Sequence, residues 1–282
     1  IAELRARLVD PLELGPEVRR LLISPAAVIA YVPFQALVPG MDVAYVPSGT
    51  TYVHLRENAG ARGKRVLALG DPAYGKQPEG RSPDAQRGER GASPLLARLP
   101  RLPGTREEAQ AVGDVVLLGD DATETRLAAE LASQKERWRA IHLACHGLLD
   151  SDRPRLSSLA VTPDDSSDGA LTVGEILRST IAADLVVLSA CETGRGMVSA
   201  AEGVVGFTRA FMVAGSPRVI VSLWKVDDEA TSALMRHFYA TWKKGGVDAA
   251  TALRKAQEHV AADERWKSPV FWAAWQLWGL PD

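Results

Sequence analysis

From about residue 63 onward, short apolar runs alternate with longer amphipathic stretches of helical length. This alternation is typical of βα units, in which helices join parallel strands and cover both faces of one sheet. The strand-like runs are RVLALG at 65–70, VVLLG at 115–119, RAIHLACHG at 139–147, ADLVVLSA at 183–190, RVIVSLW at 218–224 and FWAAWQLWG at 271–279. We therefore predict an α/β fold with a mostly parallel central sheet and helices on both of its faces.

The amphipathic stretches predict the helices between these strands. The first begins at Thr105, which forms a capping-box pattern with Glu108. The others cover 123–133, 171–179, 201–215, 227–244 and 247–262. Residues 74–104 are rich in Gly, Pro, Ser and Arg, which predicts a long loop.

Residues 1–62 differ in character, because they read as short strands and turns without clear βα alternation. We predict a partial N-terminal subdomain over 1–62 and the main α/β domain over 63–282. The chain opens on Ile1 rather than Met, so we expect it to be part of a longer polypeptide.

Charge and cysteine content exclude several function classes. A formal net charge of -2 provides no basic field for nucleic acid, and no apolar run is long enough to span a bilayer. The two cysteines supply neither a disulfide framework nor a CxxC zinc pattern. We expect a cytoplasmic protein that needs no metal or cofactor and binds no nucleic acid or membrane directly.

Two predicted strands end in residues that could carry chemistry. His146 follows the run at 139–145, and Cys191 follows the run at 183–190. Active sites of open α/β sheets gather at the carboxyl ends of the strands, so the imidazole and the thiol could meet there. A thiol is mostly protonated at neutral pH and needs a base to become a nucleophile. The backbone N–H groups of Gly147 and Cys191 could stabilise an oxyanion, which is the requirement of acyl transfer.

Structural roles compete with this interpretation. A buried cysteine is more often a small core residue, which is the role that we predict for Cys145 inside its strand. His142 is expected to be a strand residue held by hydrogen bonds. The three other histidines have no ligand spacing and are expected on the surface or in the core.

Across nearly its whole length, the sequence resembles the CHAT peptidase family, relatives of caspases and separases that often follow TPR repeats. The segments that carry the resemblance are YVPFQAL (31–37), VLALGDPAY (66–74), LPGTREEA (102–109), HLACHG (142–147), DGALTVGEIL (168–177), ADLVVLSACETG (183–194), EGVVGFTRAFMVAG (202–215), VIVSLWKVDDEAT (219–231), ALRKAQ (252–257) and FWAAWQLWG (271–279). One departure is Cys145, where the family commonly has threonine before the histidine.

The resemblance implies a caspase-like sheet and a catalytic dyad of His146 and Cys191 that cleaves a protein partner. It also implies that the substrate adds itself as an extended strand beside 220–224, with Ser222 and Trp224 as candidates for pairing and pocket wall. By the same analogy, Asp71 and Ser189 line the S1 pocket, where Asp71 would favour a basic side chain.

Alternatives remain open at this stage. Asp71 could equally belong to a turn and accept hydrogen bonds from backbone N–H groups. The whole chain could be a catalytically silent scaffold, or an acyltransferase or thioesterase that uses the same dyad. As an enzyme, it is expected to be regulated by an N-terminal TPR or other region, or by a partner protein, in bacterial-type defence or signalling.

Overall fold

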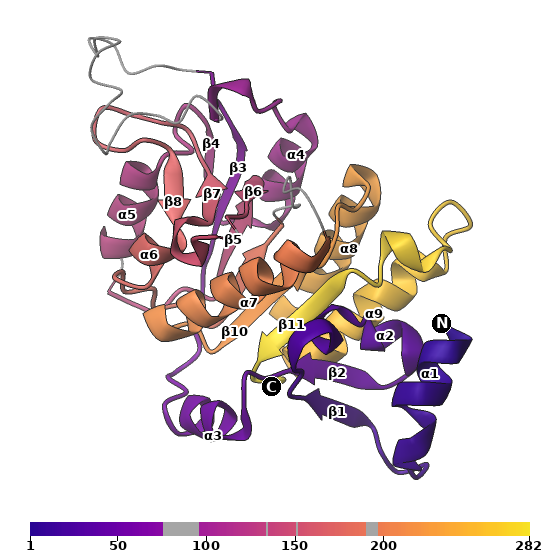
Figure 1. The fold of residues 1–282 in the computed structure, drawn as a ribbon. Helices are drawn as coiled ribbons and strands as arrows, with labels where there is room; N and C mark the ends of the chain where they lie inside the picture. The colour runs from indigo at the N-terminus through magenta and orange to yellow at the C-terminus, as the bar shows by residue number, and fades with distance from the viewer. Residues whose placement is uncertain (76–95, 134, 151, 190–196) are drawn as a thin grey trace.

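The computed structural model describes residues 1–75, 96–133, 135–150, 152–189 and 197–282, without the side chains of 197–204. Its centre is an eight-stranded sheet in the order β1-β2-β11-β10-β9-β5-β3-β4 (Figure 1). Neighbouring strands run parallel except for β10 and β11. The predicted mostly parallel sheet is therefore confirmed.

Most of these strands coincide with the apolar runs of the sequence. They are β1 (Arg20–Ile23), β2 (Asp42–Tyr45), β3 (Val66–Pro72), β4 (Val115–Gly119), β5 (Ala140–Ala144), β9 (Val186–Leu188), β10 (Arg218–Ser222) and β11 (Trp275–Gly279). A second, antiparallel sheet consists of β6 (His146–Leu148), β7 (Ser158–Ala160) and β8 (Ala170–Thr172).

The helices lie on both faces of the large sheet (Figure 1). They are α1 (Ala2–Leu8), α2 (Phe34–Leu37), α3 (Gly49–Glu57), α4 (Pro103–Val112), α5 (Glu124–Ser133), α6 (Val173–Ile176), α7 (Met197–Ala214), α8 (Asp228–Lys243) and α9 (Ala249–Ala261). None of the helices in the described ranges is long and apolar enough to cross a lipid bilayer.

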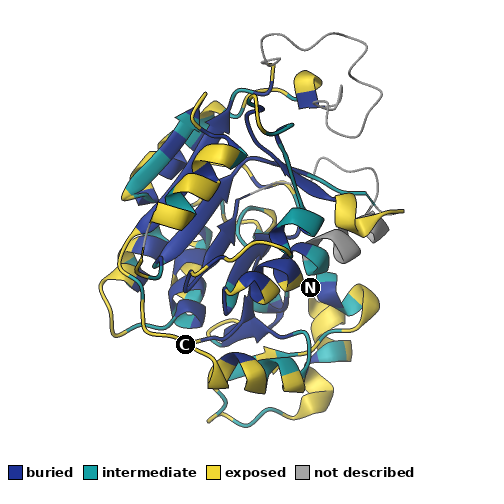
Figure 2. Ribbon diagram, turned by 90° about the vertical axis from the view of Figure 1, so that its left-hand side faces the viewer, coloured by how far each residue is buried: buried dark blue, intermediate teal, exposed yellow. Residues whose placement is uncertain are grey.

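Side chains along each strand alternate between two apolar cores, as the period of a strand requires. On β5, Ile141 and Leu143 join the core that α5 and α7 cover, whereas Ala140 joins the core under α4, α8 and α9. Figure 2 shows the buried strands between helices whose outer faces are exposed. Because both faces are covered, the central strands are mostly apolar.

The N-terminal residues extend the same sheet. β2 pairs with β11 through Tyr45 and Trp278, whose rings stack at 5.3 Å between centroids. The sheet therefore crosses the predicted boundary at residue 62, and the division into two parts stays a prediction. The expectation of strands and turns fails at α3, which Ser48 begins by accepting a hydrogen bond from the N–H of Thr51.

Helix α4 begins two residues earlier than the sequence predicts, so Thr105 is not its cap. Pro103 occupies the first turn, where its missing N–H costs no hydrogen bond. The Thr105 hydroxyl instead donates to the Leu102 carbonyl (2.7 Å) and accepts the N–H of Asp71 (2.8 Å). The capping-box prediction was wrong because Thr105 lies inside α4, where its hydroxyl binds the Asp71 N–H at the end of β3.

Glycine is required where β3 meets α4. A Cβ atom on Gly70 would lie 2.4 Å from the Thr105 carbonyl oxygen and 2.9 Å from the Cβ of Ala109. The pairing of β3 with β4 shifts register between Gly70 and Pro72. Asp71 lies in that irregularity with a positive φ of 48°, a conformation that costs a non-glycine residue free energy.

We expect Gly70→Ala to lower the free energy of unfolding by about 1–3 kcal/mol, because the new methyl group overlaps helix backbone. Gly49→Ala is the matched control, since a Cβ there meets no heavy atom of the described residues within 4 Å. Guanidinium denaturation of both variants measures the difference. Equal stability of the two variants would contradict the close contact between β3 and α4.

Candidate active site

His146 is the first residue of β6 and follows the end of β5, a central strand of the large sheet, by two positions. Its side chain is buried, with 6% of the residue exposed, and its Nε2 lies 2.8 Å from the carbonyl oxygen of Pro100. A carbonyl only accepts hydrogen bonds, so Nε2 carries the proton and Nδ1 is the basic nitrogen of the neutral ring. The geometry thus selects one tautomer.

Tyr74, two residues after the end of β3, also holds His146 in place. Its hydroxyl accepts a hydrogen bond from the backbone N–H of His146 (3.3 Å), and the two ring centroids lie 5.2 Å apart. Only 1% of Tyr74 is exposed, and burial raises its pKa, so the hydroxyl stays neutral. Backbone and ring of His146 are therefore both fixed.

The pKa of His146 lies below its usual value. Burial is the main cause, the positive charge of Lys225 adds to it, and the hydrogen bond to Pro100 opposes both. The neutral imidazole is therefore favoured at neutral pH, which is the form that can accept a proton.

Strand β9 leads to the predicted nucleophile. Ser189 is buried, and its N–H donates to the carbonyl of Leu143 (2.9 Å), so the pairing of β9 with β5 continues beyond Leu188. Cys191 lies outside the described residues. Gly147 is buried in β6 opposite Leu159 of β7. Its oxyanion role and that of Cys191 stay predictions.

The predicted substrate-binding residues at the end of β10 lie in different surroundings. Ser222 is buried, and its hydroxyl has no hydrogen-bond partner among the described residues. Trp224 is half-buried, and its indole donates to the Val270 carbonyl (2.8 Å), which fixes the ring. Between these two residues, the N–H of Leu223 donates a hydrogen bond to the Ala274 carbonyl. Both edges of β10 are paired over Val219–Val221, with β9 on one side and β11 on the other, so a substrate strand could pair only beyond these residues, and that pairing stays a prediction.

Asp71 has two guanidinium partners. Its carboxylate accepts hydrogen bonds from Nε and Nη2 of Arg101 (3.0 and 2.5 Å) and from Nε of Arg106 (2.9 Å). The side chain of Asp71 is 5% exposed, whereas those of the arginines are 53% and 43% exposed. A basic substrate group would therefore compete for Asp71 with two arginines of this chain.

The two residues that we assigned to packing have that character. Cys145 is 1% exposed in the core beneath α5 and α7. His142 is fully buried on the opposite face, where its Nε2 lies 3.1 Å from Glu108 Oε1 and its Nδ1 lies 3.4 Å from the Tyr239 hydroxyl. The expectation that His142 is held by hydrogen bonds in its strand is confirmed.

Some residues that shape the site were absent from the sequence prediction. Tyr74 and Lys225 lie in the segments 66–74 and 219–231 that carry the family resemblance. Each follows a predicted strand, and that position could have indicated a place near the active site. The Pro100 carbonyl is a backbone group, which any residue type supplies, so side-chain chemistry could not identify it.

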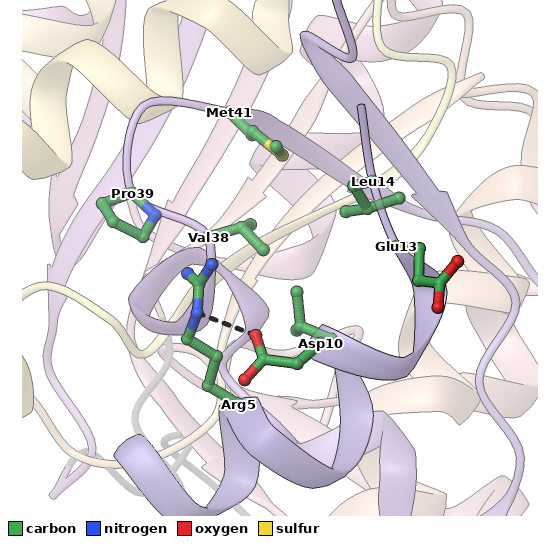
Figure 3. A pocket seen from close by; sticks show the side chains of 8 residues that line it. Arg5, Asp10, Glu13, Leu14, Val38, Pro39 and Met41 are labelled. Atoms are coloured by element: carbon green, nitrogen blue, oxygen red, sulfur yellow. Dashed lines mark ion pairs between the residues drawn. The ribbon is translucent and has the colours of Figure 1, made fainter. Parts of the chain in front are cut away.

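A pocket of about 270 Å³ lies elsewhere, between α1 and the segment after α2 (Figure 3). Arg5 forms an ion pair there with Asp10 (3.2 Å) and donates to the Leu37 carbonyl (2.6 Å). The pocket is lined by Arg5, Val9, Asp10, Glu13, Leu14, Val38, Pro39 and Met41. None of them belongs to the predicted active site, and none carries a thiol or a hydroxyl, so we assign this pocket no chemistry.

Burial raises the pKa of the Cys145 thiol to about 12. We therefore expect Cys145 in a Cys191→Ala variant to react with iodoacetamide at pH 7.5 at least ~10³-fold more slowly than a free thiol. Mass spectrometry of the native and guanidinium-unfolded chains measures the two rates. Rapid labelling of the native variant would show that Cys145 is accessible and reactive.

Comparison with known proteins supports the family and the fold. The CHAT domain model matches residues 1–280. Tetratricopeptide repeat protein 28 is 28% identical in Homo sapiens and 27% in Mus musculus, each over 220 residues and 63% of this chain. The chain spans only 8% of the length of these relatives.

Two solved structures are similar in fold at low sequence identity. The Saccharomyces cerevisiae separase–securin complex aligns at a TM-score of 0.55 and 14% identity, over 92% of this chain and 15% of that one. The Arg-specific cysteine proteinase gingipain R aligns at a TM-score of 0.55 and 10% identity, over 100% of this chain and 68% of that one. The fold is therefore caspase-like, and the chain belongs to the CHAT domain family.

Proposed function

We propose that this chain is a cysteine endopeptidase in which His146 and Cys191 form the catalytic pair. The observation that carries the proposal is the register of two parallel strands, in which Leu143 of β5 is the partner of Leu188 of β9. His146 and Cys191 each follow that pair by three positions in the sequence. Both residues follow the carboxyl ends of adjacent parallel strands, which favours side chains that meet at one edge of the sheet.

The tautomer of His146 suits the chemistry. Nδ1 accepts the thiol proton of Cys191, and the sulfur attacks the carbonyl carbon of the peptide bond. The tetrahedral oxyanion is held by the N–H groups of Gly147 and Cys191. His146 then returns the proton to the leaving amine, and water hydrolyses the thioester to release the acid and restore the thiol.

The similar structures favour a peptidase that acts on, or is controlled by, another protein. Gingipain R is a cysteine proteinase, and separase was solved in complex with securin. The curated relatives are tetratricopeptide repeat proteins, so an N-terminal repeat region or a separate partner is the proposed regulator. Ser189, Ser222 and Trp224 are the proposed substrate contacts beside the catalytic pair.

A peptidyl chloromethyl ketone tests this function, because it alkylates an activated cysteine next to a substrate site. We expect labelling of the wild-type chain and of Cys145→Ala, and none of Cys191→Ala. His146→Ala should slow labelling by roughly 10²–10⁴-fold, the usual contribution of a general base. Mass spectrometry identifies the labelled residue.

Three outcomes would count against the peptidase. Labelling that persists in Cys191→Ala would place the nucleophile elsewhere, and near-normal labelling of His146→Ala would remove the base. If the wild-type chain stays unlabelled, alone and in an extract of the cells that produce it, the result favours the catalytically silent scaffold.

A further inference from the structure

The Pro100 carbonyl that holds His146 belongs to the short segment between the 3₁₀ turn Leu96–Arg98 and α4. A carbonyl can orient an imidazole only if its own position is fixed. Leu96 and Leu99 fix the segment partly through apolar contact with the cluster around Tyr74. The residue directly after Pro100, Arg101, adds a polar anchor.

That anchor is bidentate. Arg101 donates to both carboxylate oxygens of Asp71, and its Nη2 also lies 3.4 Å from the Asp71 carbonyl oxygen. The planar guanidinium matches a carboxylate with two parallel hydrogen bonds, which restrict direction as well as distance. The position of Pro100 is thereby tied to the end of β3.

Asp71 is itself held more firmly than a surface ion pair would require. Its N–H donates to Thr105, its carboxylate also accepts from Arg106, and its backbone keeps a left-handed conformation in the interrupted β3–β4 pairing. Residues keep such strain only where their surroundings over-determine it, which occurs most often at functional sites. Asp71 in β3 binds Arg101, and the neighbouring Pro100 accepts the hydrogen bond from His146.

We infer that Asp71 is a positioning residue, which acts through Arg101 to hold the Pro100 carbonyl against His146 and so keeps the imidazole proton on Nε2. This role deepens the proposed peptidase and rests on it, since Nδ1 must then be the nitrogen that accepts the proton of Cys191. It also gives Asp71 a task that needs no basic substrate, because both partners of its carboxylate belong to this chain.

The test reads the tautomer directly. The chain is labelled with ¹⁵N-histidine, and the ring-nitrogen signals of His146 are identified by their loss in His146→Gln. We expect a protonated Nε2 and an unprotonated Nδ1 in the wild-type chain. In Arg101→Gln the two signals should move toward each other, because the released ring samples both tautomers.

Arg106→Gln is the matched control, since it removes the other guanidinium partner of Asp71 and leaves Arg101 and Pro100 in place. Its His146 signals should match those of the wild type. Unchanged signals from the four other histidines show that each variant is folded. If Arg101→Gln does not fold, Arg101→Lys keeps the charge but loses the bidentate geometry, and the same shift is expected.

Wild-type His146 signals in a folded Arg101→Gln or Arg101→Lys variant would overturn the inference, and so would an equal shift in Arg106→Gln. The spectra require neither substrate nor Cys191, so the positioning role can be tested separately from the peptidase. If the chain is inactive but the His146 signals still shift in Arg101→Gln, the peptidase is rejected and the positioning role is retained. In an active chain, chloromethyl ketone labelling of Arg101→Gln should slow on the order of 10²-fold, as expected for a displaced catalytic group.

Discussion

Parallel pairing of β5 with β9 is the constraint on which the rest of the site depends. Both strands are buried on both faces, and alternate side chains enter two separate apolar cores, so a shift of one residue would exchange the contents of those cores. The register of Leu143 with Leu188 is therefore strongly determined. Ser189, the described residue after β9, keeps that alignment through its hydrogen bond to the Leu143 carbonyl. An apolar core can in this way set the position of polar residues at the end of a strand.

The end of β3 controls the other side of His146. Gly70 lets the strand approach α4 more closely than a side chain would permit. Two of the residues that follow it, Asp71 and Tyr74, influence His146 in different ways. Tyr74 contacts the histidine directly, whereas Asp71 reaches it through the segment before α4. The contact of Tyr74 with His146 is buried, whereas the hydrogen bonds of Pro100 and Arg101 are partly buried, so solvent competes least with the first.

The sequence predicted most strands because buried strands in a covered sheet are mostly apolar runs. It also indicated His146 as a candidate catalytic residue, because that residue stands at the end of such a run. It failed where contacts far apart in the chain decide the outcome. Thr105 has the pattern of a helix cap, but its hydroxyl is used by Asp71, which lies 34 positions earlier. The pairing of Asp71 with Arg101 and Arg106 likewise depends on the fold and leaves no local pattern, so the sequence could not indicate it.

The place of β11 in the sheet has a consequence for biosynthesis. This strand lies between β2 and β10, although residues 42–45 and 275–279 are almost at opposite ends of the described chain. During translation β1 and β2 emerge before β11, which joins them to the rest of the sheet in the described residues. The β1–β2 pair therefore has an unpaired edge until β11 has been synthesised, and such edges are sites where other chains can pair.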